Sequence, residues 1–503
     1  MDKDLLLGID IGTQSAKTVL FDTKGNIVRE KQKEYELVCP EPGWAEQDPQ
    51  KWWNVSAEKT REIVESLDDP EKIKAVGVCG QMHAPVPIDE SGNLLYRSPL
   101  LWCDKRNKKQ TREAEEKLDE ERIMEITGNP ITPAWSAMKL LWMKENTREA
   151  YEKAENFLMP KDFINFKLTG NAYTDPSDAS GTILYDVKNE DWSKEVAEML
   201  EIDLSKFPDI VPSHKKMGEV SSEASEKTGL AKGTPVVTGG ADFMCTLLAG
   251  GVVSEGDAAD IAGTASEVAF FSKEPLKNEN VMNVRHVTEE GWVPFGIQEG
   301  GLLRWFRDEF GTKEMTEADE RNISPYEVMI EEASDVEPGS KGLIITPFFL
   351  GQRPNYPEAT GTVHGLTTAH GRAHFIRALM EGITYFMKEV LDIAEESGLE
   401  VESFVGLGGG AKNYLWRKIK ADVYNKPILT LESYEGGALG AAMLAGVGIG
   451  KFDSPKSAAD KIVSIKDREE PDPEAHREYM KFYRRYKTVN KYSNKITKEV
   501  ESP

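Results

Sequence analysis

Short hydrophobic runs separated by turn residues mark the N-terminal part of the chain. Apolar and β-branched residues cover 5–11, 16–21 and 27–33, and Gly- and Asp-containing turns lie between them. Runs of this kind are typical of strands joined in antiparallel order. Helical spacing of apolar residues follows over 52–67, and 73–79 is predicted to be another strand.

The second half of the chain repeats this order. Strands are predicted over 236–239, 257–261, 267–272, 292–299, 342–350 and 404–407. Gly-Thr-x-Ser turns at 12–15 and 263–266 lie about half the chain apart, and an offset of that size suggests two related lobes. We therefore predict an α/β protein with an N-terminal lobe over 1–250 and a C-terminal lobe over 251–503.

Helices are predicted between and after these strands. They cover much of 108–170, then 243–249, 300–310, 370–395, the Gly/Ala-rich 436–445 and the tail 474–498. In the tail, Tyr479, Phe482, Tyr483 and Tyr486 recur at helical spacing. We interpret them as an aromatic stripe that docks onto the body of the protein.

Charge and cysteine content narrow the function classes. The net charge of −24 argues against nucleic acid or an anionic membrane surface as a partner. No apolar run reaches the 18 residues of a membrane span. The four cysteines form no Cys-x-x-Cys pair, so a zinc cluster or redox motif is not indicated. A cytoplasmic enzyme is the expectation.

Three turns are candidates for holding phosphate. Asp10 ends a predicted strand and precedes the turn 12–15, which can present N–H groups and hydroxyls to phosphate while the carboxylate organises Mg²⁺. The turn 263–266 repeats this pattern, and Gly408-Gly-Gly-Ala411 lies between a strand and a helix. Neither a P-loop nor a dinucleotide fingerprint is complete in this chain.

Other polar residues have two interpretations each. Asp242 precedes an apolar helix, so it is either a helix cap or a general base. His83 is either a solvent-exposed loop residue or a ligand of a polyol. Asp104 and Arg106 form either a surface ion pair or a pocket pair. His370 and His374 have metal-ligand spacing but lack the accompanying Glu, so we expect histidines at a helix start or on the surface.

Taken together, these motifs resemble the carbohydrate kinase family that includes glycerol kinase, gluconokinase and xylulokinase. The resemblance runs from Gly8 to about Gly446 and implies two lobes of the actin-like, ribonuclease-H-like ATPase fold, with nucleotide and sugar between them. Gly80-Gln-Met-His83, Leu101-Trp-Cys-Asp104-Lys-Arg106 and Thr174-Asp-Pro-Ser-Asp178 resemble the xylulokinase members most. Ala84 and Glu267 depart from the usual family pattern.

The resemblance implies ATP-dependent phosphorylation of a sugar hydroxyl, with D-xylulose converted to D-xylulose 5-phosphate. Asp242 would be the catalytic base, and Asp10 would be catalytic through Mg²⁺. The implied sugar contacts are Met82, His83, Asp104 and Asp242. The implied ATP contacts are Thr13, Gln14, Ser15, Lys17, Gly263, Thr264, Gly300, Gly409, Gly410 and Asn413. Related kinases are often dimers, so a homodimer is expected.

Three alternatives stay open. In the first, the substrate is another sugar or polyol such as L-ribulose, gluconate or glycerol, although the residues at 80–83 disfavour glycerol. In the second, the protein is an actin-like ATPase that moves its lobes without modifying a sugar. In the third, it is a silent sugar-binding regulator, against which the presence of both Asp10 and Asp242 argues.

Overall fold

A mixed sheet forms the core of the first lobe. The computed structural model describes residues 4–263, 265–298, 301–351, 359–433 and 435–501. Strand β1 (Leu5–Ile11) pairs antiparallel with β2 (Ser15–Asp22), and β2 pairs antiparallel with β3 (Ile27–Glu34). On its other edge β1 pairs parallel with β4 (Ile73–Gly80). The sheet continues through β12 (Pro235–Val237) and β11 (Lys216–Glu219), and β13 (Gly240–Ala241) also pairs with β4. The predicted N-terminal strands are confirmed.

The second lobe repeats the topology of the first. Its strand order is β17-β15-β14-β20-β21-β22, with β16 outside β17, and the first lobe has β3-β2-β1-β4-β12-β11. Parallel and antiparallel pairs occur at corresponding places in both sheets. The bounds are β14 (Asp257–Ala262), β15 (Ser266–Phe270), β16 (Met282–Arg285), β17 (Trp292–Gln298), β20 (Ser403–Leu407), β21 (Ile428–Leu431) and β22 (Ile465–Glu469). This equivalence supports the predicted duplication.

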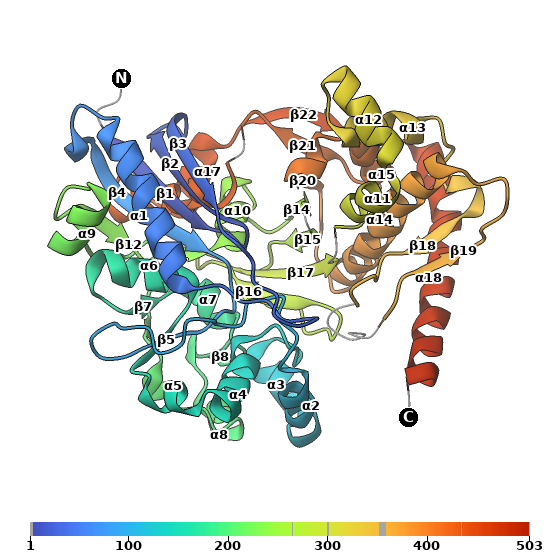
Figure 1. Ribbon diagram of the computed structural model, residues 1–503. Helices are drawn as coiled ribbons and strands as arrows, with labels where there is room; N and C mark the ends of the chain where they lie inside the picture. The colour runs from blue at the N-terminus through green and yellow to red at the C-terminus, as the bar shows by residue number, and fades with distance from the viewer. Residues whose placement is uncertain (1–3, 264, 299–300, 352–358, 434, 502–503) are drawn as a thin grey trace.

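Two layers of helices cover the first sheet (Figure 1). Leu5, Leu7 and Ile9 pack with the tryptophans of α1 (Pro49–Glu65) on one face. Because side chains alternate along a strand, Gly8 and Asp10 point to the other face. Helices α10 (Asp242–Ala249) and α16 (Gly436–Gly448) pack there.

Helix α16 belongs to the C-terminal part of the sequence but packs on the sheet of the first lobe. A Cβ built on Gly8 would lie 2.0 Å from the carbonyl oxygen of Ala438, and one on Gly77 would lie 2.0 Å from that of Ala441. Glycine therefore permits the close approach of helix and sheet. The division of the chain at residue 250 stays a prediction, and the segment 436–448 crosses back over it.

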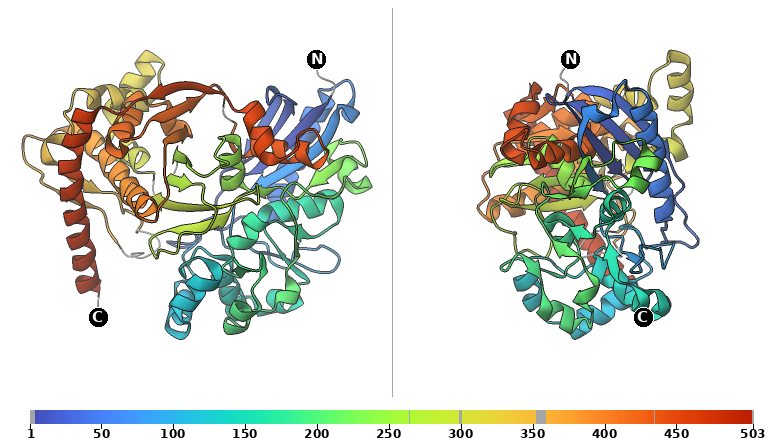
Figure 2. Two further views of the ribbon diagram at one scale, coloured as in Figure 1. Left: turned by 180° about the vertical axis from the view of Figure 1, so that it is seen from behind. Right: turned by 90° about the vertical axis from the view of Figure 1, so that its left-hand side faces the viewer.

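The remaining helices surround the two sheets (Figures 1 and 2). In the first lobe they are α2 (Lys108–Lys117), α3 (Glu120–Thr127), α4 (Ser136–Asn146), α5 (Arg148–Lys153), α6 (Pro160–Thr169), α7 (Pro176–Ser180), α8 (Lys194–Met199) and α9 (Ser222–Thr228). Those that follow are α11 (Leu302–Phe310), α12 (Thr312–Arg321), α13 (Pro325–Ser334), α14 (Arg372–Glu396), α15 (Tyr414–Tyr424), α17 (Pro455–Ile462) and α18 (Pro473–Glu501). Short strands are β5 (Val86–Ile88), β6 (Asn156–Leu158), β7 (Tyr173–Thr174), β8 (Tyr185–Asp186), β9 (Asp191–Trp192), β10 (Asp209–Ile210), β18 (Ile344–Thr346) and β19 (Thr362–His364).

Helix α18 confirms the predicted aromatic stripe. Tyr479, Tyr483 and Tyr486 are buried against α14, and the Tyr479 hydroxyl accepts a hydrogen bond from Arg377 at 2.6 Å.

The His370–His374 pair lies at the start of α14, where His374 Nδ1 accepts the N–H of Gly371. The strand in this region is shorter than the predicted 342–350, and β18 covers only Ile344–Thr346. None of the helices in the described part of the chain has the length and apolarity that a bilayer crossing requires.

Candidate active site

Asp10 lies at the end of β1, in register with Lys17 on β2 and Cys79 on β4. Burial raises the pKa of its carboxyl group to about 6, although the Cys79 thiol and the Lys17 charge act in the opposite direction. Its Oδ1 atom is buried and has no hydrogen-bond partner among the described residues. A carboxylate oxygen in this state is available to a cation.

The phosphate turn after Asp10 is held by a hydrogen-bond network. The Thr13 hydroxyl donates to Gln81 Oε1 at 3.2 Å and accepts the indole N–H of Trp102 at 2.9 Å. The Ser15 hydroxyl accepts a hydrogen bond from Gln32 at 2.7 Å, and Gln14 is exposed. Because Gln81 precedes Met82 and His83, this network links the turn to the expected sugar residues.

The positive charge of Lys17, which the sequence suggested for a phosphate, is neutralised by two carboxylates. Its ammonium group lies 2.5 Å from Glu435 and 3.2 Å from Glu30. Burial lowers the pKa of Lys17, but the two carboxylates raise it by more. The structure therefore places Lys17 beside the phosphate turn in an ion-pair network that also ties β2 to the start of α16.

Asp242 is the first residue of α10 and is partly exposed. Burial of the carboxyl group and the nearby charge of Asp10 raise its pKa to about 7, against a hydrogen bond at 2.7 Å from the N–H of Phe243. A carboxylate that titrates near neutral pH is suited to accept a proton from a substrate hydroxyl. The structure thus brings together the two carboxylates that the sequence singled out.

Tyr35 is a site residue that the sequence did not reveal. Its hydroxyl donates to the carbonyl of Gly12 in the phosphate turn. Burial and the charges of Asp10 and Asp242 raise the pKa of Tyr35 well above its ordinary value. Tyr35 lies near both carboxylates because the chain after β3 folds back toward them. No local sequence motif predicts this position.

His83 is fixed in an unusual backbone conformation. Its φ of 66° lies in the left-handed region, which non-glycine residues seldom adopt. Its Nδ1 lies 2.7 Å from the carbonyl oxygen of Gly181, and its ring packs edge-on against Trp135 at 5.2 Å. Lys139 donates to its carbonyl at 2.8 Å. Such backbone strain in a well-held loop is a feature of ligand-binding positions. Met82 is buried beside it.

Asp104 is held by protein groups in this structure, and its contact with the sugar stays a prediction. Its side chain is 0% exposed and accepts the guanidinium of Arg106 at 2.6 Å and the N–H of Ala45 at 2.6 Å. Arg106 in turn lies 3.6 Å above the ring of Trp44 and pairs with Glu46 at 2.6 Å. Asp104 is therefore the acceptor that anchors Arg106.

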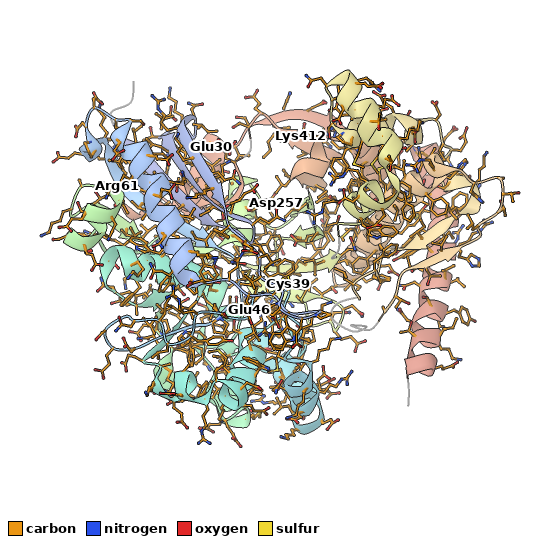
Figure 3. The ribbon with its side chains drawn as sticks, in the orientation of Figure 1. Glu30, Cys39, Glu46, Arg61, Asp257 and Lys412 are labelled. Atoms are coloured by element: carbon orange, nitrogen blue, oxygen red, sulfur yellow. The ribbon has the colours of Figure 1, made fainter. Side chains whose placement is uncertain are left out.

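A cavity of about 690 Å³ in the second lobe brings together four of the ten expected nucleotide residues. Gly263, Gly409, Gly410 and Asn413 line it, with apolar walls from Leu302, Ile330 and Ile383. Asn413 also caps α15 by accepting the N–H of Trp416 at 3.0 Å. Thr264 and Gly300 lie outside the described residues. Figure 3 labels Lys412, beside this cavity, and Glu30 on β3 of the other lobe.

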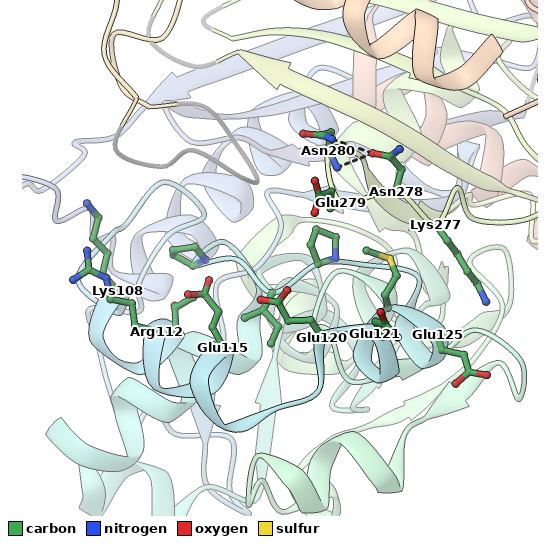
Figure 4. A pocket seen from close by; sticks show the side chains of 15 residues that line it. Lys108, Arg112, Glu115, Glu120, Glu121, Glu125, Lys277, Asn278, Glu279 and Asn280 are labelled. Carbon is green, nitrogen blue, oxygen red and sulfur yellow. Dashed lines mark hydrogen bonds between the residues drawn. The ribbon is translucent and has the colours of Figure 1, made fainter. Parts of the chain in front are cut away.

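A larger cavity of about 870 Å³ lies away from these residues (Figure 4). It is formed by α2, α3 and the segment 277–280, and its lining is rich in glutamates, including Glu115, Glu120 and Glu125. None of the predicted site residues that the structure describes lines it. Volume alone is therefore a poor guide to the reacting groups in this protein.

The two lobes share one topology. The first has carboxylates at its strand ends, and the second has a glycine-lined cavity. Together these features define a two-lobed kinase of the actin-like ATPase fold. Models for the FGGY family of carbohydrate kinases match the chain, the N-terminal domain at residues 5–249 and the C-terminal domain at residues 258–449. The chain therefore belongs to the FGGY family of carbohydrate kinases and is an ATP-dependent sugar kinase. The predicted family and fold are confirmed.

Similar proteins match over nearly their whole length. A xylulose kinase of Bacillus subtilis is 32% identical over 97% of this chain and 94% of its own. A gluconokinase of the same organism is 32% identical over 94% of this chain and 93% of its own. The crystal structure of xylulose kinase from Rhodospirillum rubrum aligns with a TM-score of 0.89 at 26% identity, covering 98% of this chain and 99% of that one.

Proposed function

We propose that the protein transfers the γ-phosphoryl group of ATP to the 5-hydroxyl of D-xylulose, giving D-xylulose 5-phosphate and ADP. The observation that carries this proposal is Asp242, whose pKa of about 7 and position beside Asp10 suit a general base for a substrate hydroxyl. The similarity to several xylulose kinases supports the choice of sugar.

In the proposed reaction Asp242 accepts the proton of the 5-hydroxyl while that oxygen bonds to the γ-phosphorus. The bond from phosphorus to the bridging oxygen breaks, and ADP leaves with the electron pair. Positioning and charge neutralisation supply most of the rate, because the phosphoryl group needs little covalent help. Closure of the lobes would exclude water and so limit hydrolysis of ATP.

We propose that Asp10 holds Mg²⁺, directly or through water. Its buried Oδ1, without a hydrogen-bond partner among the described residues, fits a hard cation that prefers oxygen ligands. When bound, Mg²⁺ neutralises charge on the phosphates of ATP. The backbone of the turn 12–15 would contact the same phosphates, and the cavity lined by Gly409 and Gly410 would hold the adenosine.

The cation beside His83 favours an uncharged sugar over a sugar acid. Lys139 donates to the carbonyls of His83 and Ala134 at 2.8 and 2.6 Å. The carboxylate of gluconate would have to compete with these partners and would meet the repulsion of Asp242. Gluconate is nevertheless the second candidate, because a gluconokinase is as similar in identity as the xylulose kinase.

The first test is ADP release with Mg-ATP and a panel of D-xylulose, L-ribulose, gluconate and glycerol, with a blank without sugar. Strong release with D-xylulose and little in the blank is expected. Release with gluconate instead would move the substrate and keep the mechanism. A fast blank that no sugar changes would overturn the kinase proposal in favour of a lobe-moving ATPase.

The second test is Asp242→Ala, which should abolish transfer and leave ATP affinity largely intact in calorimetry. The matched control is Asp203→Ala, which removes a carboxylate that caps the short turn 204–206. Full activity in Asp242→Ala would refute the base assignment. We also propose a homodimer, which light scattering tests as twice the mass of one chain, whereas the cytoplasmic location stays a prediction.

A further inference from the structure

A buried ionic cluster lies behind the strand that leads to Asp242. Lys161, at the start of α6, is surrounded by Asp162, Asp175 and Asp178, and its ammonium lies 3.0 Å from Asp175 and 3.1 Å from Asp178. The side chains of these four residues are at most 1% exposed. Buried charges are costly unless they are paired, so such a cluster calls for a structural or catalytic reason.

One member of the cluster connects directly to the backbone before Asp242. Asp175 Oδ2 accepts the hydroxyl of Ser177 at 2.6 Å and the N–H of Ser177 at 3.0 Å. The Ser177 hydroxyl oxygen then accepts the N–H of Ala241 at 2.8 Å. Because a hydroxyl has one proton, its donation to Asp175 leaves its lone pairs directed at Ala241. The result is a fixed chain from Lys161 through Asp175 and Ser177 to Ala241.

The orientation of the Asp242 carboxylate depends on that backbone. Its carboxylate accepts a hydrogen bond from the N–H of Phe243, its own neighbour in sequence, at 2.7 Å. Its direction is therefore set by where β13 ends and α10 begins. Strand β13 consists only of Gly240 and Ala241, which pair with β4 on one side. On the other side, a Cβ on Gly240 would lie 3.3 Å from Ser177 Oγ, so the two segments are in close contact.

We infer that Ser177, held by Asp175 and Lys161, is a positioning residue that aims the Asp242 carboxylate at the sugar hydroxyl. This inference rests on the proposed function of Asp242. Ser177 touches neither sugar nor nucleotide in this scheme, and it acts through the N–H of Ala241. General-base catalysis requires the base within hydrogen-bond reach of the proton, so a small displacement of the backbone lowers the rate.

Ser213 offers a matched control within the same cluster. Its hydroxyl donates to the same Asp175 Oδ2 at 2.8 Å, and its side chain is equally buried at 0%. Its contact with the catalytic strand runs through its main chain, where its carbonyl accepts the N–H of Gly239. Ser213→Ala therefore removes a hydroxyl from Asp175 without touching the bond to Ala241.

The experiment compares Ser177→Ala, Ser177→Cys, Ser213→Ala and Asp242→Asn in the whole 503-residue chain. We expect Ser177→Ala to lower kcat by on the order of 10- to 100-fold, with the KM of ATP and of the sugar changed less than about threefold. Ser213→Ala should keep kcat within about threefold at a similar loss of thermal stability, because it removes the same kind of hydrogen bond. Ser177→Cys keeps the shape but weakens the acceptor, so its kcat should fall as in Ser177→Ala.

Each outcome decides between defined alternatives. Equal kcat losses in Ser177→Ala and Ser213→Ala would overturn the inference, since general destabilisation of the cluster would then explain both. Wild-type kcat in Ser177→Cys would overturn it in favour of packing. If Asp242→Asn is inactive and Ser177→Ala is fully active, only the positioning role fails. If Asp242→Asn is active, the proposed function of Asp242 itself fails.

Discussion

Replacing Asp242 by Asn should stabilise the ligand-free protein at pH 8 while removing its activity. Burial and the charge of Asp10 raise the pKa of Asp242 from 3.8 to about 7. When folding raises the pKa of a carboxyl group, the folded protein binds that proton more tightly than the unfolded chain does. Its contribution to stability is therefore fully present below pH 4 and is lost as the pH rises to about 7. At pH 8 the ionised carboxylate of Asp242 lowers the free energy of unfolding, and the uncharged amide of Asn does not.

The magnitude follows from the pKa shift. One pKa unit corresponds to about 1.4 kcal/mol, so the shift of Asp242 sets an upper bound of roughly 4 kcal/mol. Asp242 is partly exposed, and solvent screening reduces this to about 2 kcal/mol. In lobes of this size, 1 kcal/mol shifts the melting temperature by roughly 2–4 °C. We expect Asp242→Asn to raise Tm by about 5 °C at pH 8 and by only about 2 °C at pH 5, where the folded protein still holds the proton but the unfolded chain has already lost it.

The assay is differential scanning calorimetry of both proteins without ligand at pH 5 and pH 8, with activity measured on the same samples. The amide keeps the size of the side chain, and its oxygen can still accept the N–H of Phe243. An equal change of Tm at both pH values would show that the effect is one of packing. A lower Tm for the variant at pH 8 would refute the assignment of Asp242 as a destabilising, raised-pKa carboxylate.

Three further results are expected. The kcat/KM for the sugar should fall about tenfold per pH unit below pH 7, because the base must be ionised, and a flat profile from pH 5 to 8 would contradict the raised pKa of Asp242. His83→Ala should raise the sugar KM severalfold and leave the ATP KM nearly unchanged, and steady-state kinetics with the opposite pattern would remove His83 from the sugar site. Gly410→Ala should weaken ATP binding in calorimetry, because its Cβ would lie 2.4 Å from that of Ala262 in the cavity wall. Gly409→Ala is the control, since no described residue lies within 4 Å of a Cβ built on Gly409, and equal losses in both variants would count against a steric cause.

Much of the fold was predictable because its signals are local. The strands around 5–11, 15–22 and 27–34 are short apolar runs bounded by turns, and such patterns depend on neighbours in sequence. The equivalence of the two lobes was predicted from two turns, and the strand orders of the two sheets support it. The helix-start histidines and the aromatic stripe of α18 were also read from spacing alone.

The sequence by itself determined the strands, the lobes, the family and the residue types that suit phosphoryl transfer, because each of these is a property of adjacent residues or of motif order. Only the tertiary structure decided which charges are free to act. It buried Asp104 beneath Arg106, paired Lys17 with Glu435, and brought Tyr35 to the two carboxylates. Partners far apart in sequence meet only when the chain has folded, and burial and neighbouring charge, which set the pKa of Asp242, exist only there.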